Sequence, residues 1–189
     1  DVEGFTVDGL DIRNTSDDSG ITHSMALYVR GSSGTVVDSS IYSGLFGYSN
    51  GLTLSATSDV TVENSLLSNI SQIDGISFSL ANLQSITRTV TVGYRGSTDY
   101  GDSPDDDSEL ILRDSTIEGV SAEAPDNNYV YCVYVYSSGD LLIENNTIDP
   151  GFAGGFPYGI QVAGTLAGTT ATIRGNSIRS GNAGTHPYG

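Results

Sequence analysis

The chain repeats one short pattern, in which two apolar residues flank a turn-forming Asn, Asp, Gly or Ser. The first apolar residue stands two positions before the turn residue, and the second stands three positions after it. The clearest copies begin at Val62, Leu112, Ile143 and Ile173, and weaker ones begin at Val7 and Val36. Successive copies start 29, 26, 50, 31 and 30 residues apart. Self-similarity at such a period is typical of repeat architectures.

The single spacing of 50 residues is close to twice this period. It predicts one degenerate repeat near Val90-Thr91-Val92, between the copies at Val62 and Leu112. With that repeat included, the chain holds about seven units of roughly 25–31 residues each.

A second pattern, in which apolar and polar residues alternate over a few positions, falls between copies of the first. It is often introduced by glycine, and its copies are residues 26–29, 51–54, 75–78, 132–135 and 159–162. Alternation with a period of two is typical of β-strands, and the Gly, Asn, Ser and Asp residues around it are typical of turns. No segment sustains a 3.6-residue apolar period, so we expect little helix.

A unit of two or three short strands cannot bury its apolar face alone, but stacked copies can. The expected fold is therefore all-β: a right-handed parallel β-helix of about seven coils, a single domain over residues 1–189 with an acidic loop excursion at 94–109. At the turns, Asn64, Asp114 and Asn145 suit a left-handed backbone. Their stacked side chains would hydrogen-bond from coil to coil.

The repeat alignment also places charges in rows. The position before the turn residue carries, in successive clear copies, Glu63, Arg113, Glu144 and Arg174. The position after the second apolar residue carries Arg13 early and later Glu118, Asp149 and Arg179. Neighbours in adjacent coils would lie roughly 5 Å apart, where opposite charges are favourable. We therefore predict a charge ladder Arg113–Glu144–Arg174, with chance placement on a solvated face as the alternative.

Together these patterns resemble the parallel β-helix repeat of pectate-lyase-like proteins and of many archaeal and bacterial surface proteins. The resemblance covers essentially the whole chain. It implies an architecture that proteins of unrelated function share, and it assigns no activity.

The charge of the chain is strongly acidic, with 23 acidic residues against 7 basic ones and a formal net charge of −16. All basic residues are arginines. In molar salt the Debye length falls to about 3 Å, so a dense carboxylate surface no longer repels itself strongly. The absence of lysine therefore favours a haloarchaeal-type surface or secreted protein over a generic acidic secreted one. The charge argues against nucleic acid and anionic membranes as partners.

The chain has no stretch apolar and long enough to insert in a membrane, and its single cysteine, Cys132, excludes an internal disulfide. We expect Cys132 to be a half-buried strand residue. Residues 186–189 (His-Pro-Tyr-Gly) echo residues 156–159, after which a strand follows. The solenoid is therefore expected to be uncapped at its C-terminal end. Open ends expose strand edges, so other copies, or further coils of a longer chain, are the expected partners there.

Six carboxylates crowd into residues 99–109. Hard oxygen ligands at such density could bind Ca²⁺, although the spacing is not that of an EF-hand. The alternative is an acidic solvated loop. The candidate ligands are Asp102, Asp105, Asp106, Asp107 and Glu109.

Tyrosines and polar residues recur on one side of the second pattern. Its outward position reads, in successive copies, Tyr28, Thr53, Ser77, Tyr134 and Gln161. Such a face could bind polysaccharide by stacking and hydrogen bonding, with Tyr28, Tyr134 and Gln161 as candidate contacts. Surface tyrosines scattered over a β-rich protein are the alternative. Strict alternation also predicts that the tyrosines at 129, 131, 134 and 136 divide between the two faces of one strand.

Three sequence positions match the N-glycosylation pattern, namely Asn14, Asn69 and Asn145. No catalytic residue can be named. The pairs Asp17-Asp18 and Asp105-Asp106 are adjacent, so on an extended chain they point in opposite directions.

The leading functional hypothesis is a non-catalytic extracellular structural or adhesive β-helix of a salt-adapted microbe, at the cell surface or in a filament or viral fibre. One alternative is the β-helical body of a polysaccharide lyase or glycoside hydrolase. Another is a polysaccharide-binding module without chemistry.

Overall fold

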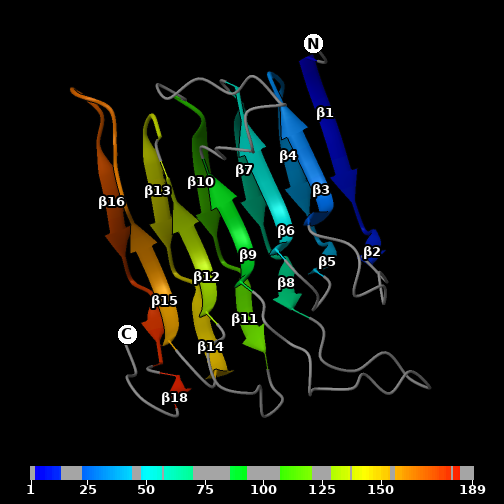
Figure 1. Cartoon of the computed structure of the whole chain (residues 1–189). Helices are drawn as coiled ribbons and strands as arrows, with labels where there is room; N and C mark the ends of the chain where they lie inside the picture. The colour runs from blue at the N-terminus through cyan, green and yellow to red at the C-terminus, as the bar shows by residue number, and fades with distance from the viewer. Residues whose placement is uncertain are drawn as a thin grey trace.

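The computed structural model describes residues 3–13, 23–43, 48–56, 58–69, 86–92, 107–120, 129–136, 138–153, 156–179 and 181–183. Within these residues the chain forms strands and turns and no helix. The strands build three sheets, and every strand pair is parallel. Except for the short β18, the neighbouring strands in each sheet are three apart in chain order (Figure 1).

Sheet A contains β1 (Glu3–Asp8), β4 (Ser33–Val37), β7 (Asp59–Glu63), β10 (Glu109–Arg113), β13 (Leu141–Glu144) and β16 (Ala171–Arg174). Sheet B contains β2 (Asp11–Arg13), β5 (Ser40–Ser43), β8 (Leu66–Asn69), β11 (Thr116–Val120), β14 (Thr147–Ala153) and β17 (Ser177–Ile178), and β18 (Asn182–Ala183) also pairs with β14. Sheet C contains β3 (His23–Arg30), β6 (Tyr48–Ser55), β9 (Ile86–Val92), β12 (Tyr129–Val135) and β15 (Phe156–Val162).

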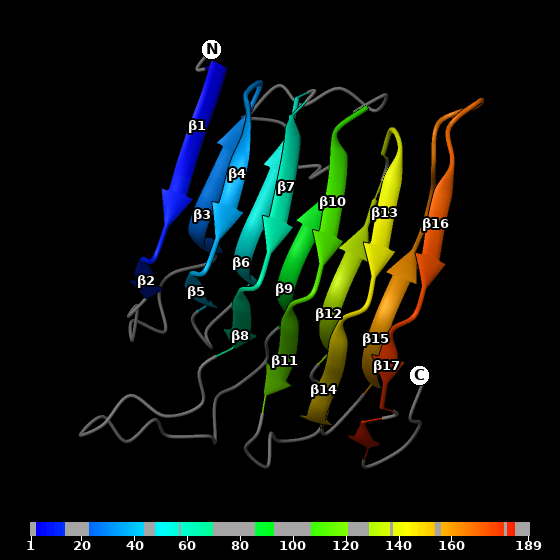
Figure 2. The ribbon, with the colours of Figure 1, turned by 180° about the vertical axis from the view of Figure 1, so that it is seen from behind.

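One strand from each sheet makes one coil, and successive coils stack along a single axis (Figure 2). The chain is therefore a parallel β-helix, as the sequence predicted. The coils number about six rather than seven. The prediction of a degenerate repeat between Val62 and Leu112 is wrong, because β7 pairs directly with β10 and these two residues lie opposite each other.

The 50-residue spacing is thus one long coil. The segment Val90-Thr91-Val92 belongs to β9, the sheet C strand of that coil. The additional residues of the coil, at 70–85 and 93–106, lie outside the described part of the chain. The strand expected at 75–78 and most of the loop expected at 94–109 lie there too.

The core is made of apolar rows that run from coil to coil. Fully buried members of these rows are Val36, Val62, Leu112 and Ile143 from sheet A, Ile41, Leu67, Ile117 and Ile148 from sheet B, and Leu52, Val90 and Val133 from sheet C. Full burial of such a side chain stabilises the fold by about 1.5–3 kcal/mol. The rows end in β16 and β17, where Ile173 and Ile178 remain 44% and 39% exposed.

The turn between sheets A and B has a left-handed residue in successive coils. The φ angles are positive at Asp38 (49°), Asn64 (47°), Asp114 (51°), Asn145 (56°) and Gly175 (66°). The prediction for Asn64, Asp114 and Asn145 is confirmed. Asn and Asp tolerate this backbone region better than other side chains, and Gly adopts it freely.

The side chains that hydrogen-bond from coil to coil at this turn belong to the next residue. The left-handed residue contributes its backbone N–H instead, as Asp114 and Asn145 do to the carbonyl oxygens of Glu144 and Arg174. The backbone N–H of Ser65 donates to Ser115 Oγ at 3.1 Å, and that of Ser115 donates to Asn146 Oδ1 at 3.0 Å. The N–H of Asn146 donates in turn to Asn176 Oδ1 at 2.9 Å. The expectation that the side chains of the left-handed residues would make these bonds was wrong, because those side chains are exposed, whereas Ser65, Ser115 and Asn146 are buried.

The charge rows have the predicted register. In sheet A, Glu63, Arg113, Glu144 and Arg174 occupy one row, which divides into the ion pairs Glu63–Arg113 and Glu144–Arg174, the latter at 2.7 Å. In sheet B, Arg179 pairs with Asp149 at 3.3 Å. Arg13 differs, because it pairs with Asp11 of its own strand at 2.7 Å and lies over the Tyr42 ring.

Candidate functional site

The outer surface of sheet C is shaped by an irregularity that every strand of this sheet shares. The register omits one residue in each strand, namely Ala26, Gly51, Thr89, Cys132 and Gly159. Cys132 and Val133 are consecutive, yet both are fully buried in the core. Alternation therefore breaks between them, and Tyr131 and Tyr134 emerge on the same outer face, with ring centroids 5.0 Å apart. The prediction that the four tyrosines of this strand divide between two faces is wrong, because alternation holds only in an unbroken strand.

Cys132 is more buried than the sequence suggested. It is fully enclosed, and its Sγ lies 3.8 Å from the carbonyl oxygen of Ile117. Burial raises the pKa of the thiol well above its ordinary value. A protonated, enclosed thiol is a packing residue and not a nucleophile.

Aromatic rings stack between β12 and β15. The Tyr131 and Tyr158 centroids lie 4.8 Å apart with an interplanar angle of 7°, and those of Tyr129 and Phe156 lie 5.2 Å apart at 21°. Tyr136 completes the group, edge-on to Tyr134 at 5.3 Å. We name Tyr129, Tyr131, Tyr134, Tyr136, Phe156 and Tyr158 the aromatic patch. The patch combines the apolar surface of its rings with the phenol hydroxyls of its tyrosines.

Arg88, on β9, adjoins the aromatic patch. Its guanidinium carbon lies 4.5 Å from the Tyr134 ring centroid and 5.8 Å from that of Tyr131. Burial raises the pKa of Tyr131 to about 12, against the opposing effect of the Arg88 charge, and it also raises the pKa of Tyr134. Both phenols therefore remain neutral hydrogen-bond donors at physiological pH.

The candidate contacts Tyr28, Tyr134 and Gln161 do share one register row. Thr53 and Thr91 stand between the first two, so Thr91 takes the place that the sequence assigned to Ser77. Tyr134 and Gln161 are direct neighbours and half-buried. The row is not a continuous open face, because both threonines are fully buried.

Tyr28 stands apart from the aromatic patch at the β3 end of this row. It is 37% exposed, and its hydroxyl lies 2.7 Å from Ser55 Oγ. A sugar that contacts Tyr134 and Gln161 would therefore have to pass over the buried threonines to reach it.

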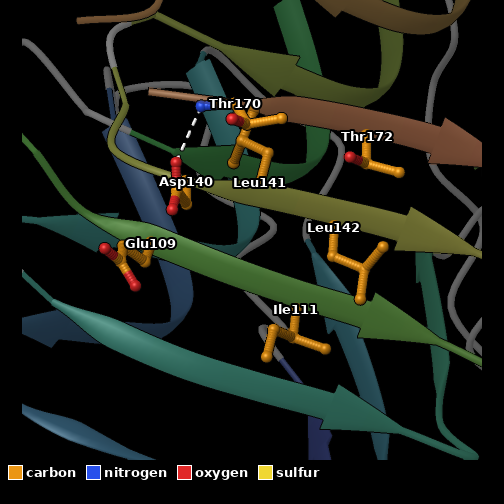
Figure 3. Close-up of a pocket in the computed structure, with 7 residues that line it drawn as sticks. All are labelled: Glu109, Ile111, Asp140, Leu141, Leu142, Thr170 and Thr172. Carbon is orange, nitrogen blue, oxygen red and sulfur yellow. Dashed lines mark hydrogen bonds between the residues drawn. The ribbon is translucent and has the colours of Figure 1, made fainter. Parts of the chain in front are cut away.

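A second surface feature is a cavity of about 350 Å³ on sheet A (Figure 3). Its lining residues come from three successive coils and are Glu109, Ile111, Asp140, Leu141, Leu142, Thr170 and Thr172. Glu109 and Asp140 lie toward one side and Ile111 and Leu142 toward the other. Asp140 Oδ1 accepts the backbone N–H of Thr170 at 2.7 Å.

The carboxylate of Glu109 lies in an acidic environment. Partial burial raises its pKa, and the negative charges of Asp59, Asp140 and Asp107 raise it further. Sequence reasoning took Glu109 as a residue of the acidic loop and a candidate calcium ligand, and it missed Asp140. The repeat could have paired them, because they stand one period apart, as do Leu112 and Ile143.

The remaining candidates lie partly outside the described residues. Asp102, Asp105, Asp106 and Asn14 lie outside the described residues, while Asp107 lies two residues before the start of β10. Asn69 ends β8, and Asn145 is the exposed turn residue. Within the described ranges no group of three or more His, Cys, Asp or Glu side chains could hold a metal ion. No helix in that part of the chain is suited to crossing a membrane.

No protein-family model, curated protein or solved structure matches this chain.

Proposed function

We propose that this chain is a non-catalytic, extracellular β-helix that binds polysaccharide on the outer face of sheet C. The observation that carries the proposal is the gathering of the aromatic patch beside Arg88. Tyrosine offers sugars an apolar body and a hydroxyl tip, and a guanidinium adds directed N–H donors. In this reading the protein is a surface or adhesive segment of a salt-adapted organism.

The side chains next to the irregularity support a binding role for the patch. The break recurs in every strand of sheet C, so a regularly alternating β12 would lose its register with β9 and β15. In β12 the residues that flank the break on the outer face are Tyr131 and Tyr134, which therefore lie together next to Arg88. The tyrosines at these positions, and not the break itself, distinguish this coil.

The framework beneath the patch supports a scaffold role. Each coil pairs with the next through three parallel sheets, and the side chains inside form one continuous core. A binding surface on such a framework keeps its shape, which lowers the entropic cost of binding a flexible polymer.

Affinity electrophoresis in native gels that contain neutral polysaccharides tests the proposal. We expect at least one polymer to retard the full chain, and Tyr134→Ala to abolish the retardation. Tyr42→Ala is the matched control, because Tyr42 is also a half-buried tyrosine beside an arginine, but on sheet B. Equal retardation of both variants, or no retardation of the unmodified chain by any polymer, would reject the proposal.

The cavity on sheet A favours a second candidate function, glycoside hydrolysis. Hydrolases pair a carboxylic acid of raised pKa with a second carboxylate, and Glu109 and Asp140 lie together in a cavity with the pKa of Glu109 raised. Release of reducing ends from a polysaccharide panel would favour this function if Glu109→Gln abolished it and Glu144→Gln did not.

A further inference from the structure

Two buried N–H donors on sheet C lie in adjacent coils without a hydrogen-bond acceptor. Asn50 of β6 stands directly opposite Arg88 of β9. Asn50 is 1% exposed, and its Nδ2 has no partner. The Nε of Arg88 is likewise buried and unpartnered. Buried polar atoms are nearly always hydrogen-bonded, so two such neighbours require an explanation.

Neighbouring side chains fix the direction of both donors. The Thr91 hydroxyl donates to Asn50 Oδ1 at 3.1 Å, which orients the amide and leaves Nδ2 as its unpaired end. The Tyr131 and Tyr134 rings hold the guanidinium of Arg88. The donors are therefore preorganised, and the surrounding contacts do not use them.

Thr53 adds a third unpaired group on the same outer face. It is fully buried, lies opposite Thr91, and its Oγ1 has no hydrogen-bond partner. The residues before and after it, Leu52 and Leu54, point into the core. Its hydroxyl is therefore directed away from the core, toward the side of the sheet that carries Arg88.

Arg88 also differs from four arginines on sheets A and B that form ion pairs. Arg13, Arg113, Arg174 and Arg179 each contact a carboxylate. Arg88 has no such contact within the described part of the chain, although the chain carries 23 acidic residues. A positive charge beside unpaired donors is suited to a negatively charged acceptor.

We propose that Asn50, Thr53 and Arg88 form a binding site for one small oxyanion, a carboxylate or sulfate group. The site takes a single charged group and not a polyanion, because the net charge of −16 repels a densely charged polymer. Only the source of the oxyanion rests on the proposed function. If the chain binds polysaccharide, the oxyanion is an acidic substituent on an otherwise neutral glycan.

Side-chain NMR of the full chain tests the site directly. Sodium acetate or sodium sulfate replaces sodium chloride stepwise at constant ionic strength, and the Nε–H signal of Arg88 and the Nδ2 signals of Asn50 are followed. We expect both to shift together and to saturate, while the Nε–H signal of Arg174 does not. Signals that stay unchanged, or that follow Arg174, would show that water alone fills the site and overturn the proposal.

Two substitutions probe the site by different means. Arg88→Lys keeps the charge but removes the fixed Nε–H, and we expect it to weaken anion binding at least tenfold. Asn50→Asp places a carboxylate where the ligand would lie, so we expect it to abolish the anion response and raise the thermal midpoint in anion-free buffer. Arg174→Gln is the matched control and should bind as the unmodified chain does. Unchanged binding in both Arg88→Lys and Asn50→Asp would reject the site.

The source of the oxyanion is resolved with a matched pair of sugars, lactose and sialyllactose, which differ by one carboxylated residue. Acetate binding together with tighter binding of sialyllactose supports both proposals. Acetate binding without any glycan binding keeps the oxyanion site and rejects the proposed function. Glycan binding that is insensitive to acetate and to Arg88→Lys keeps the function and rejects the site.

Discussion

The arginines on the outer faces of sheets A and C have opposite surroundings. On sheet A, Arg113 and Arg174 each lie next to a glutamate of the adjacent coil and form an ion pair with it. On sheet C, Arg88 lies between an asparagine and a tyrosine, and its Nε is left without an acceptor. On sheet A the chain itself supplies the anionic partners of the arginines, whereas on sheet C N–H donors remain without an acceptor.

The difference shows which part of a solenoid stabilises the fold. Where the pattern repeats from coil to coil, each side chain meets the neighbour that satisfies it, as in the Ser65–Ser115–Asn146 row. Where a row brings together residues that do not satisfy each other, as at Asn50 and Arg88, donors are left without acceptors. Outward-facing positions of a repeat protein can carry binding residues in this way without loss of the stacked core.

Two equally buried asparagines provide the largest expected contrast. Asn146 accepts from the Ser115 N–H and donates to the Leu112 carbonyl, so Asn146→Ala leaves both groups buried and unpaired. We expect a loss of about 1–3 kcal/mol of unfolding free energy for each. Asn50→Ala removes only the acceptor of the Thr91 hydroxyl, so we expect it to lower the unfolding free energy less than Asn146→Ala does. Urea denaturation measures both, and an equal loss would contradict the distinction between the two regions.

Alkaline pH provides a contrast of intermediate size. The pKa of Tyr131 is about 12 in the fold against an ordinary value of 10.0, because burial disfavours the phenolate. Folding therefore favours the protonated ring, and this contribution is fully present below the ordinary value and is lost as pH rises through the raised one. We expect unfolding free energy to fall over that window, and to fall less in Tyr131→Phe. Identical pH profiles would contradict the burial of this hydroxyl.

The smallest expected effects concern two glutamates at opposite ends of sheet A strands. Glu63→Gln removes the partner of Arg113 and should lower the denaturation midpoint in low salt, an effect that vanishes at about 1 M salt. Glu109→Gln should instead raise the midpoint at neutral pH, because it removes a carboxylate whose pKa is raised by burial and by Asp59. That gain should shrink as the pH falls and Glu109 of the unmodified chain becomes protonated. Shifts of the same sign would contradict this assignment.

Much of the architecture could be predicted from the sequence because it depends on local period and on residue type. The copies at Val62, Leu112, Ile143 and Ile173 do occupy one row, and the Glu144–Arg174 pair follows from that register. The left-handed turns at Asn64, Asp114 and Asn145 follow from the tolerance of Asn and Asp for that conformation. Each of these features needs only the repeat length and the chemistry of one position.

The errors arose where position along the chain does not determine position in space. A spacing of 50 residues fits two short coils or one long coil equally well, and only the pairing of β7 with β10 decides between them. Likewise, alternation could not divide the tyrosines of β12 correctly, because burying two consecutive residues is a property of the packed core.

The sequence by itself thus determined a parallel β-helix, its turn chemistry and the Glu144–Arg174 pair, because stacking converts each periodic position into a row. The tertiary structure alone decided the number of coils, the aromatic patch beside Arg88 and the unpaired donors of Asn50 and Arg88. These features depend on which side chains meet across coils, and the period of the repeat does not determine that. The break in alternation does recur once per coil, at Ala26, Gly51, Thr89, Cys132 and Gly159, but only the packed core shows which side chains it turns outward.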